Sequence, residues 1–407
     1  MWFVMQPLSQ IERDLTAGID QQRMLSRTQD WAAINSGTGN LDGLAHMAQV
    51  LADAFSALPG EVTLRDPAPV TVVDAEGREV EKPHGRHLVC SVRPQAQRRF
   101  LLTGHMDTVF PKDHPFQSLE WLDDDTLNGP GTADMKGGIA VIAEALMALE
   151  TSAAAASIGY DVMINSDEET GSLASAALID ELARGKFAVL TYEPSALPDG
   201  TLAHARGGSG NYTLTFTGKS AHAGRNPQDG RNAVVAAADC AVRLKAMQHA
   251  DLPINPAKIE GGAANNVVPD HAVLRFNIRP RTTQAAEGFE RNLDALIATL
   301  AKEHDLQIAL HGGISRPPKP VDAKAQKLFD LVRDTGAALG QTIGWQSSGG
   351  VCDGNNIAAN HVPVVDTMGV RGGKIHSPDE FMIAPSLTER AQLSAIVLHR
   401  LATGDML

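Results

Sequence analysis

The stretch YDVMINSDEETGS, residues 160–172, joins a run of apolar residues to three consecutive acids. Residues 160–164 read as a buried strand, and LASAALIDELAR (residues 173–184) has the spacing of an amphipathic helix. The acids at 167–169 therefore stand at the carboxyl end of a strand, which is where open α/β sheets build their sites. Taken alone, the stretch also fits a solvated acidic turn that caps the next helix.

The same alternation of strand and helix extends over residues 99–195. RFLLTGHMDTV (99–109) and FAVLTYEPS (187–195) read as two more buried strands, and MKGGIAVIAEALMALE (135–150) reads as a helix. Near-continuous apolar strands between amphipathic helices indicate an α/β fold with a mixed, mostly parallel sheet that is covered by helices.

The pattern changes after ARGGSG (residues 205–210). The segments that follow read as strand, helix, strand, strand, helix and strand, which is the β-α-β-β-α-β order of a ferredoxin-like α+β unit. They are NYTLTFTG (211–218), NAVVAAADCAVRLKAM (232–247), a strand near 258–261, HAVLRFNIRP (271–280), GFERNLDALIATLAKEH (288–304) and LQIALHG (306–312). RPPKP (316–320) is a proline-rich return to the first unit. Because 407 residues exceed one compact core, we expect a first domain of residues 1–207 and 317–407, interrupted by an inserted domain at 208–316.

Composition limits the partners and the compartment. The chain carries 35 basic and 48 acidic residues, a net charge of −13, which argues against nucleic acid and against an anionic membrane surface. Its three cysteines lie far apart and form no CxxC pair, which is typical of a reducing compartment. The beginning, MWFVMQPLSQIERDL, lacks the basic region of a signal peptide, and no run of about 18 apolar residues occurs. We therefore expect a cytoplasmic protein without a membrane span.

Acids and histidines gather at the ends of the predicted strands and in loops. They are His105 and Asp107 in TGHMDTV, Asp134 in GPGTADMKGG, Glu168 and Glu169 in SDEETGS, Glu193 in YEPS and His376 in RGGKIHSPDEF. Imidazole and carboxylate are ligands that zinc, cobalt and manganese accept. One such cluster would be weak evidence, whereas four at successive strand or loop ends indicate a metal site.

Six of these motifs resemble a known family. TGHMDTVFP, GPGTADMKGG, SDEETGS, EPS, GKSAHAG and GGKIHSPDE are similar, in order and spacing, to those of the co-catalytic di-zinc metallopeptidases. That family includes glutamate carboxypeptidase, aminoacylase, acetylornithine deacetylase and succinyl-diaminopimelate desuccinylase, and the chain most resembles the glutamate carboxypeptidase branch. The resemblance covers nearly the whole chain. It implies a di-zinc exopeptidase catalytic domain with an inserted lid, and a homodimer formed through that inserted domain.

The resemblance also implies two divalent metal ions per subunit, with zinc expected and cobalt or manganese as alternatives. Asp134 would bridge both ions, and the peptide bond after it would be cis. The other implied ligands are His105 and Glu193 on one metal, and Glu169 and His376 on the second. Glu168 would be the general base for a hydroxide held between the metals. Asp107 would orient the imidazole of His105.

Substrate-binding residues follow from the same resemblance. His222 would stabilise the oxyanion, within its own subunit or across the dimer, and Asn266 and Arg279 would hold the terminal carboxylate of the substrate. The backbone amides of Gly349 and Gly350 in SSGGVCDGNN could contact the same carboxylate. Thr201 and Ala203 stand where glutamate-specific relatives have lysine and serine, so a preference for glutamate is in doubt. Arg206 or His204 could take over that contact.

These residues predict metal-dependent hydrolysis of the amide bond of N-acyl amino acids or short peptides, small molecules with a free carboxylate. A carbamoyl or ureido amidohydrolase of the same family is the alternative, and a non-catalytic peptide-binding homologue is a third reading. A serine hydrolase is not supported, because GGSGN (207–211) departs from G-x-S-x-G at its last position. The metalloprotease motif H-E-x-x-H is also absent from the sequence.

Overall fold

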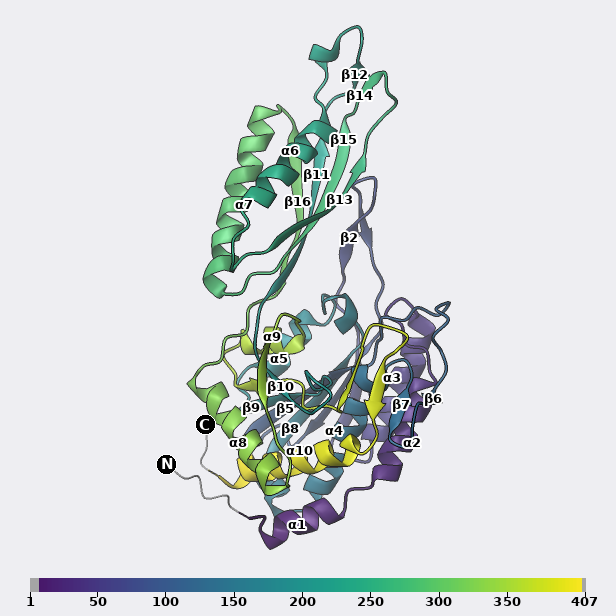
Figure 1. Ribbon diagram of the computed structural model, residues 1–407, viewed down its shortest axis with the longest axis vertical. Helices are drawn as coiled ribbons and strands as arrows, with labels where there is room; N and C mark the ends of the chain where they lie inside the picture. Colours follow the sequence, from purple (N-terminus) through teal and green to yellow (C-terminus); the bar gives the residue numbers. More distant parts are fainter. Residues whose placement is uncertain (1–6, 405–407) are drawn as a thin grey trace.

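The computed structural model describes residues 7–404 and has two bodies (Figure 1). The larger body contains a six-stranded sheet between helices, and the smaller body, here called the lid, extends away from it. Residues 1–6, which belong to the N-terminal stretch that we expect not to be a signal peptide, lie outside the described residues. None of the helices between residues 7 and 404 combines the length and apolarity needed to cross a bilayer.

The sheet of the larger body has the order β1-β4-β8-β5-β9-β18. Its strands are β1 (Glu61–Arg65), β4 (His87–Val92), β8 (Gly159–Asn165), β5 (Arg99–His105), β9 (Ala188–Thr191) and β18 (Val364–Val365). The pairs β8–β5, β5–β9 and β9–β18 are parallel, whereas β1–β4 and β4–β8 are antiparallel. The predicted α/β fold with a mixed, mostly parallel sheet is confirmed.

Helices cover both faces of this sheet because neighbouring strand residues point to opposite sides and both sides are apolar. Leu102 and Val162 belong to the core under α2 (Gln21–Ala32), α3 (Leu41–Phe55), α4 (Gly137–Glu150), α8 (Ala323–Ala338) and α10 (Ser386–Thr403). Leu101 and Met163 belong to a second core under α5 (Ala176–Ala183) and α9 (Asp353–Ala358). The remaining helix of this body, α1 (Gln10–Ala17), lies against α10. The helix expected at 173–184 begins only at Ala176, after the short turn η3 (Glu168–Thr170).

The lid is a four-stranded antiparallel sheet with the order β13-β15-β11-β16. Along the chain its elements are β11 (Ser209–Thr217), α6 (Ala233–Ala246), β13 (Ile254–Gly261), β15 (His271–Ile278), α7 (Thr283–Glu303) and β16 (Gln307–Arg316), which is the predicted ferredoxin-like order. The lid has its own apolar core, which includes Phe216, Leu274 and Phe289. A small pair, β12 (Ala221–His222) and β14 (Val267–Val268), lies at its tip (Figure 1). The domain boundaries at 207/208 and 316/317 stay a prediction.

Two further connections shape the region between the bodies. A hairpin of β2 (Thr71–Val73) and β3 (Glu79–Glu81) rises from the larger body beside the lid sheet (Figure 1). There the Arg275 guanidinium of β15 donates to the carbonyl oxygens of Val73 and Asp74, at 2.7 and 2.9 Å. The strands β10 (Leu202–Arg206) and β17 (Trp345–Ser348) pair in parallel near the start of the lid. The sequence analysis predicted neither feature.

A second small sheet brings a late segment of the chain to the end of the central sheet. Its order is β19-β20-β7-β6, with β19 (Gly372–Gly373), β20 (Phe381–Ile383), β7 (Thr126–Asn128) and β6 (Glu120–Trp121). Phe381 pairs with Asn128, so the loop between β19 and β20 lies next to the segment that follows β7. That segment enters the irregular turn η1 (Thr132–Lys136) and then α4.

Close packing at the start of α4 generates a prediction. A Cβ on Gly138 would lie 2.2 Å from the carbonyl oxygen of Tyr192, which is backbone and cannot swing away. We expect Gly138→Ala to lower the free energy of unfolding by about 1–3 kcal/mol, the usual cost of overpacking. Denaturant unfolding measures this. Gly288→Ala in α7 is the control, because its nearest atom would be 4.0 Å away and alanine favours helix. Equal stability of the two variants would contradict the prediction.

Candidate metal centre

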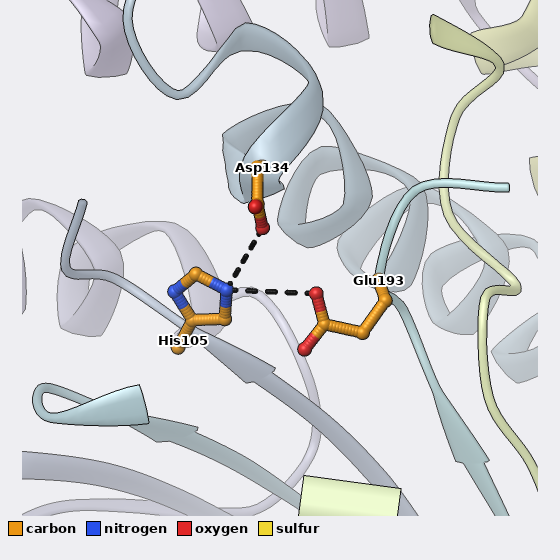
Figure 2. Close-up of side chains that lie close together, drawn as sticks. All are labelled: His105, Asp134 and Glu193. Carbon is orange, nitrogen blue, oxygen red and sulfur yellow. Dashed lines mark hydrogen bonds and ion pairs between the residues drawn. The ribbon is translucent and has the colours of Figure 1, made fainter. Parts of the chain in front are cut away.

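Two neighbouring parallel strands carry the first group of polar side chains. His105 is the last residue of β5, and Glu193 lies two residues beyond the end of β9. Figure 2 shows the imidazole between two carboxylates: His105 Nε2 lies 3.1 Å from Asp134 Oδ1 and 3.6 Å from Glu193 Oε2. All three residues are buried. The ends of β5 and β9, together with the turn η1 that carries Asp134, thus bring together three of the polar residues that the sequence analysis singled out.

The second group shares Asp134 with the first. Asp134 Oδ2 lies 3.2 Å from His376 Nε2, and Glu169 Oε2 lies 3.2 Å from the same nitrogen. In each triad the three candidate ligand atoms lie within 4.8 Å of one another. Each oxygen of one carboxylate therefore serves a different group. The two triads together therefore offer the donor set of a two-metal site, in which both metal ions would share Asp134.

The backbone presents these ligands from irregular segments. The peptide bond between Asp134 and Met135 is cis, as the resemblance implied. His376 has a φ of 63°, in the left-handed region that residues other than glycine adopt rarely. Glu169 lies in the turn η3, beyond the regular end of β8, where the strand alternation no longer separates it from Glu168.

The imidazole of His105 is oriented by its Nδ1. This nitrogen lies 3.0 Å from the carbonyl oxygen of Asp107 and donates to it, so Nε2 is the ring nitrogen that faces the two carboxylates. The Asp107 carboxylate is farther from Nδ1, at 3.4 Å. Asp107 therefore contacts His105 as predicted, with its carbonyl group as the nearer acceptor.

The Asp107 carboxylate has a second set of partners that the sequence analysis did not foresee. It accepts hydrogen bonds from the amide nitrogens of Glu168 and Glu169, each at 3.2 Å, and from the Thr38 hydroxyl at 2.7 Å. One buried acid thus holds the backbone of both glutamates. This explains how adjacent residues can direct two carboxylates toward one centre.

The pKa values of the candidate ligands reflect the burial of the carboxylates and their contacts with the two histidines. Burial raises the pKa of Glu169 to about 7 and also raises the pKa of Glu193. For Asp134, burial acts in the same direction, but hydrogen bonds from His105 and His376 hold the pKa well below its usual range. Hydrogen bonds to Asp134 and Glu169 raise the pKa of His376 to about 11. Without a metal, the histidines hold protons that balance these carboxylates, and divalent ions would balance the same charges.

Glu168 belongs to neither triad, but it directly precedes Glu169 of the second and interacts electrostatically with His105 and Glu193 of the first. Burial raises its pKa well above the ordinary range, while the Arg316 guanidinium acts to lower it. A buried carboxyl next to a metal-type cluster has the properties of a general base or acid.

Glu380 is another residue that the sequence analysis missed. Its Oε1 accepts hydrogen bonds from the amide nitrogens of Ala133 and Asp134, both at 3.0 Å. Glu380 follows His376 by four residues, so one loop supplies a candidate ligand and supports the backbone of another. The signal available in the sequence was its place in HSPDEF.

The predicted substrate residues of the lid lie at its two ends. His222 belongs to β12, and Asn266 directly precedes β14, so both lie at the exposed tip and away from the metal-type cluster of the same chain (Figure 1). Arg279 follows β15 at the opposite end, is exposed, and donates to Asn277 Oδ1 at 2.9 Å. The single chain therefore does not bring His222 to the cluster.

The remaining predictions concern the segments around β10 and β17. Gly349 and Gly350 are exposed in the loop after β17. Arg206 is buried: its Nε and Nη2 bind Asp366 at 3.0 and 2.9 Å, and its Nη1 donates to the carbonyl oxygen of Gly350 at 3.0 Å. Lys319 also binds Asp366, at 3.0 Å. Because these partners occupy its guanidinium, the arrangement does not support the predicted contact of Arg206 with a substrate.

The chain is similar to known proteins in sequence and in fold. The model of the peptidase family M20/M25/M40 matches residues 101–400. The chain is 28% identical over 403 residues to carboxypeptidase G2 from Pseudomonas sp. (strain RS-16), covering 95% of this chain and 92% of that protein. It is 30% identical over 311 residues to succinyl-diaminopimelate desuccinylase from Herminiimonas arsenicoxydans, covering 70% and 79%. A tripeptidase structure from Staphylococcus aureus subsp. aureus Mu50 superposes with a TM-score of 0.72 at 25% identity, covering 95% of this chain and 100% of that chain.

The chain therefore belongs to the peptidase family M20/M25/M40. The predicted family is confirmed, including a relative in the glutamate carboxypeptidase branch. The family is metal-dependent, and its members support a hydrolase that acts on a small molecule or peptide.

The two triads predict the response to metals. We expect chelator treatment to lower the melting temperature and added zinc to restore it, because an ion that binds only the folded chain stabilises it by mass action. His376→Ala should retain about one ion fewer per chain, measured by elemental analysis after gel filtration. His222→Ala is the control, since its imidazole lies outside both triads. Full metal content in His376→Ala would contradict the assignment.

Proposed function

We propose that this protein is a metal-dependent hydrolase that cleaves the amide bond of N-acyl amino acids or short peptides and releases the C-terminal amino acid. One observation carries the proposal: two triads share the two oxygens of Asp134, and the largely buried carboxyl of Glu168 interacts with His105 and Glu193 of one triad and directly precedes Glu169 of the other. Hydrolysis of an amide needs an activated water, a group that accepts its proton and a means to protonate the leaving amine.

His105, Asp134 and Glu193 would hold one divalent ion, and Asp134, Glu169 and His376 the other. When bound, the two ions supply Lewis acidity and lower the pKa of water in the site, with zinc the expected metal and cobalt or manganese as alternatives. Glu168 would accept the proton of the water and later deliver it to the nitrogen of the leaving group. Its raised pKa in a buried site suits both halves of that transfer.

Residues away from the centre would bind the substrate. The exposed guanidinium of Arg279 suits a terminal carboxylate, which arginine binds through paired hydrogen bonds. Gly349 and Gly350 lie in an exposed loop that could offer an amide group to the same carboxylate. His222 and Asn266 would reach a reaction centre only in another subunit or after a large lid movement, since both lie at the lid tip.

A homodimer through the lid is part of this proposal. The edge strand β13 has a free side, because the sheet order ends there, and α6 exposes Val235 and Val242 one above the other. Sedimentation of the full chain tests it, and a fully active monomer would contradict it.

Glu168 provides the sharpest test of the mechanism. We expect zinc-loaded protein to hydrolyse members of an N-acyl amino-acid panel, and Glu168→Gln to keep its metal while kcat falls by about 10²–10⁴, the usual contribution of general acid–base catalysis. Steady-state kinetics and elemental analysis measure the two quantities. Glu181→Gln, an exposed acid of α5, is the matched control.

Unchanged turnover in Glu168→Gln would remove that residue from its role. If metal-loaded wild-type protein cleaves no member of the panel but releases ammonia from carbamoyl or ureido substrates, the amidohydrolase alternative replaces the peptidase. Binding without cleavage in both panels would favour a peptide-binding homologue.

The same panel tests the preference for the C-terminal residue. Ala203 is fully buried in β10 and has no polar side chain for a γ-carboxylate, and Arg206 is occupied by Asp366. We therefore expect kcat/KM for a C-terminal glutamate to exceed that for an uncharged residue by less than about a hundredfold, or about 2.7 kcal/mol. A larger ratio would restore glutamate as the specific substrate.

A further inference from the structure

Arg316 ends the last strand of the lid, yet its side chain belongs to the candidate active site. It is the final residue of β16 and pairs with Ser209, the first residue of β11. Only 2% of Arg316 is exposed. The two chain crossings between the bodies therefore lie side by side at Ser209 and Arg316.

The Arg316 guanidinium contacts Glu168, the proposed general base, directly. Nη2 lies 2.8 Å from Glu168 Oε1 and 3.3 Å from the carbonyl oxygen of Glu168, and it donates to Ser172 Oγ at 2.8 Å. Among the ion pairs of residues 7–404, this is the one cation that contacts the Glu168 carboxylate. It holds both the backbone and the side chain of that residue.

The opposite side of the guanidinium is anchored in α9. Nη1 lies 2.6 Å from Asp353 Oδ1 and 2.9 Å from Asn356 Oδ1. Asp353 is fixed in turn by the Asn165 amide and the Ser172 hydroxyl, each at 2.6 Å. Because both Nη atoms have protein acceptors, these contacts favour a structural partner over a substrate anion.

We propose that Arg316 is a positioning residue that holds one oxygen of Glu168, so that the second oxygen is available for the proton of the attacking water. This inference rests on the proposed function. A lysine could replace the charge of Arg316 but not the planar fork that binds Glu168 and Asp353 together. Arg316 should therefore act on turnover through Glu168 and should have little effect on substrate affinity.

Kinetics of the zinc-loaded full chain test the inference. We expect Arg316→Met to lower kcat by about a hundredfold or more, toward the loss expected for removal of a general base, with KM changed less than about threefold and metal content unchanged. Arg316→Lys should recover part of kcat. In Arg316→Ala, millimolar guanidinium should raise kcat. Arg390→Met is the control, because Arg390 is equally buried but donates to the carbonyl oxygen of Gly200.

A double-mutant cycle separates positioning from a general loss of structure. We expect Arg316→Met to cost little further turnover in a Glu168→Gln background, because residues that act as a unit are not additive. Equal losses in both backgrounds, or a raised KM with unchanged kcat, would overturn the proposal.

A readout without activity keeps this inference distinct from the proposed function. In chelator-treated protein, the loss of melting temperature in Arg316→Met/Glu168→Gln should be smaller than the sum of the two single losses, because each single change already removes the same Arg316–Glu168 ion pair. Additive losses would overturn the pairing. If wild-type protein hydrolyses nothing, the proposed function fails, and this thermal cycle still decides whether Arg316 holds Glu168. If Arg316→Met does not fold, Arg316→Lys is carried through the same cycle.

Discussion

The structure of the site depends on the division of one carboxylate between two histidines. Asp134 offers one oxygen to His105 and the other to His376, and each pair gains a glutamate from a different strand or turn. A buried carboxylate with two such partners cannot rotate without losing one of them. The backbone around it is accordingly irregular and supported, with the Glu380 carboxylate accepting two amide hydrogens beside it.

The other buried charges in this region form separate ion-pair groups, each with its own partner of opposite charge. Glu168 is paired with Arg316, which also reaches Asp353, while Asp366 is paired with Arg206 and Lys319. Burying an ion is costly unless a partner of opposite charge and hydrogen bonds accompany it. Each metal-type triad contains two carboxylates and one histidine, so within a triad the histidine is the group that can carry positive charge. This difference separates the candidate metal site from Glu168 and Asp366, whose carboxylates have arginine or lysine partners.

The lid and the larger body share more than a linker. The two crossings meet at Ser209 and Arg316, and the β2–β3 hairpin adds a contact through Arg275. Arg316 belongs to a lid strand and also contacts Glu168. One residue therefore connects the lid to the proposed general base. The tip with β12 and β14 lies at the opposite end of the lid. His222 of β12 therefore lies away from the metal-type cluster of its own chain.

The sequence alone determined the strand–helix alternation, the ferredoxin-like order of the lid and the candidate ligands, because periodicity and short motifs are local properties. It could not reveal that Asp107 holds the amides of both glutamates, that Glu380 supports Asp134, or that Arg206 is occupied by Asp366, since these partners are 61 to 246 residues apart. The contact of Arg316 with Glu168 spans 148 residues and was hidden for the same reason. Tertiary structure decided these matters because a hydrogen bond depends on distance and direction in space, and only the folded chain sets them.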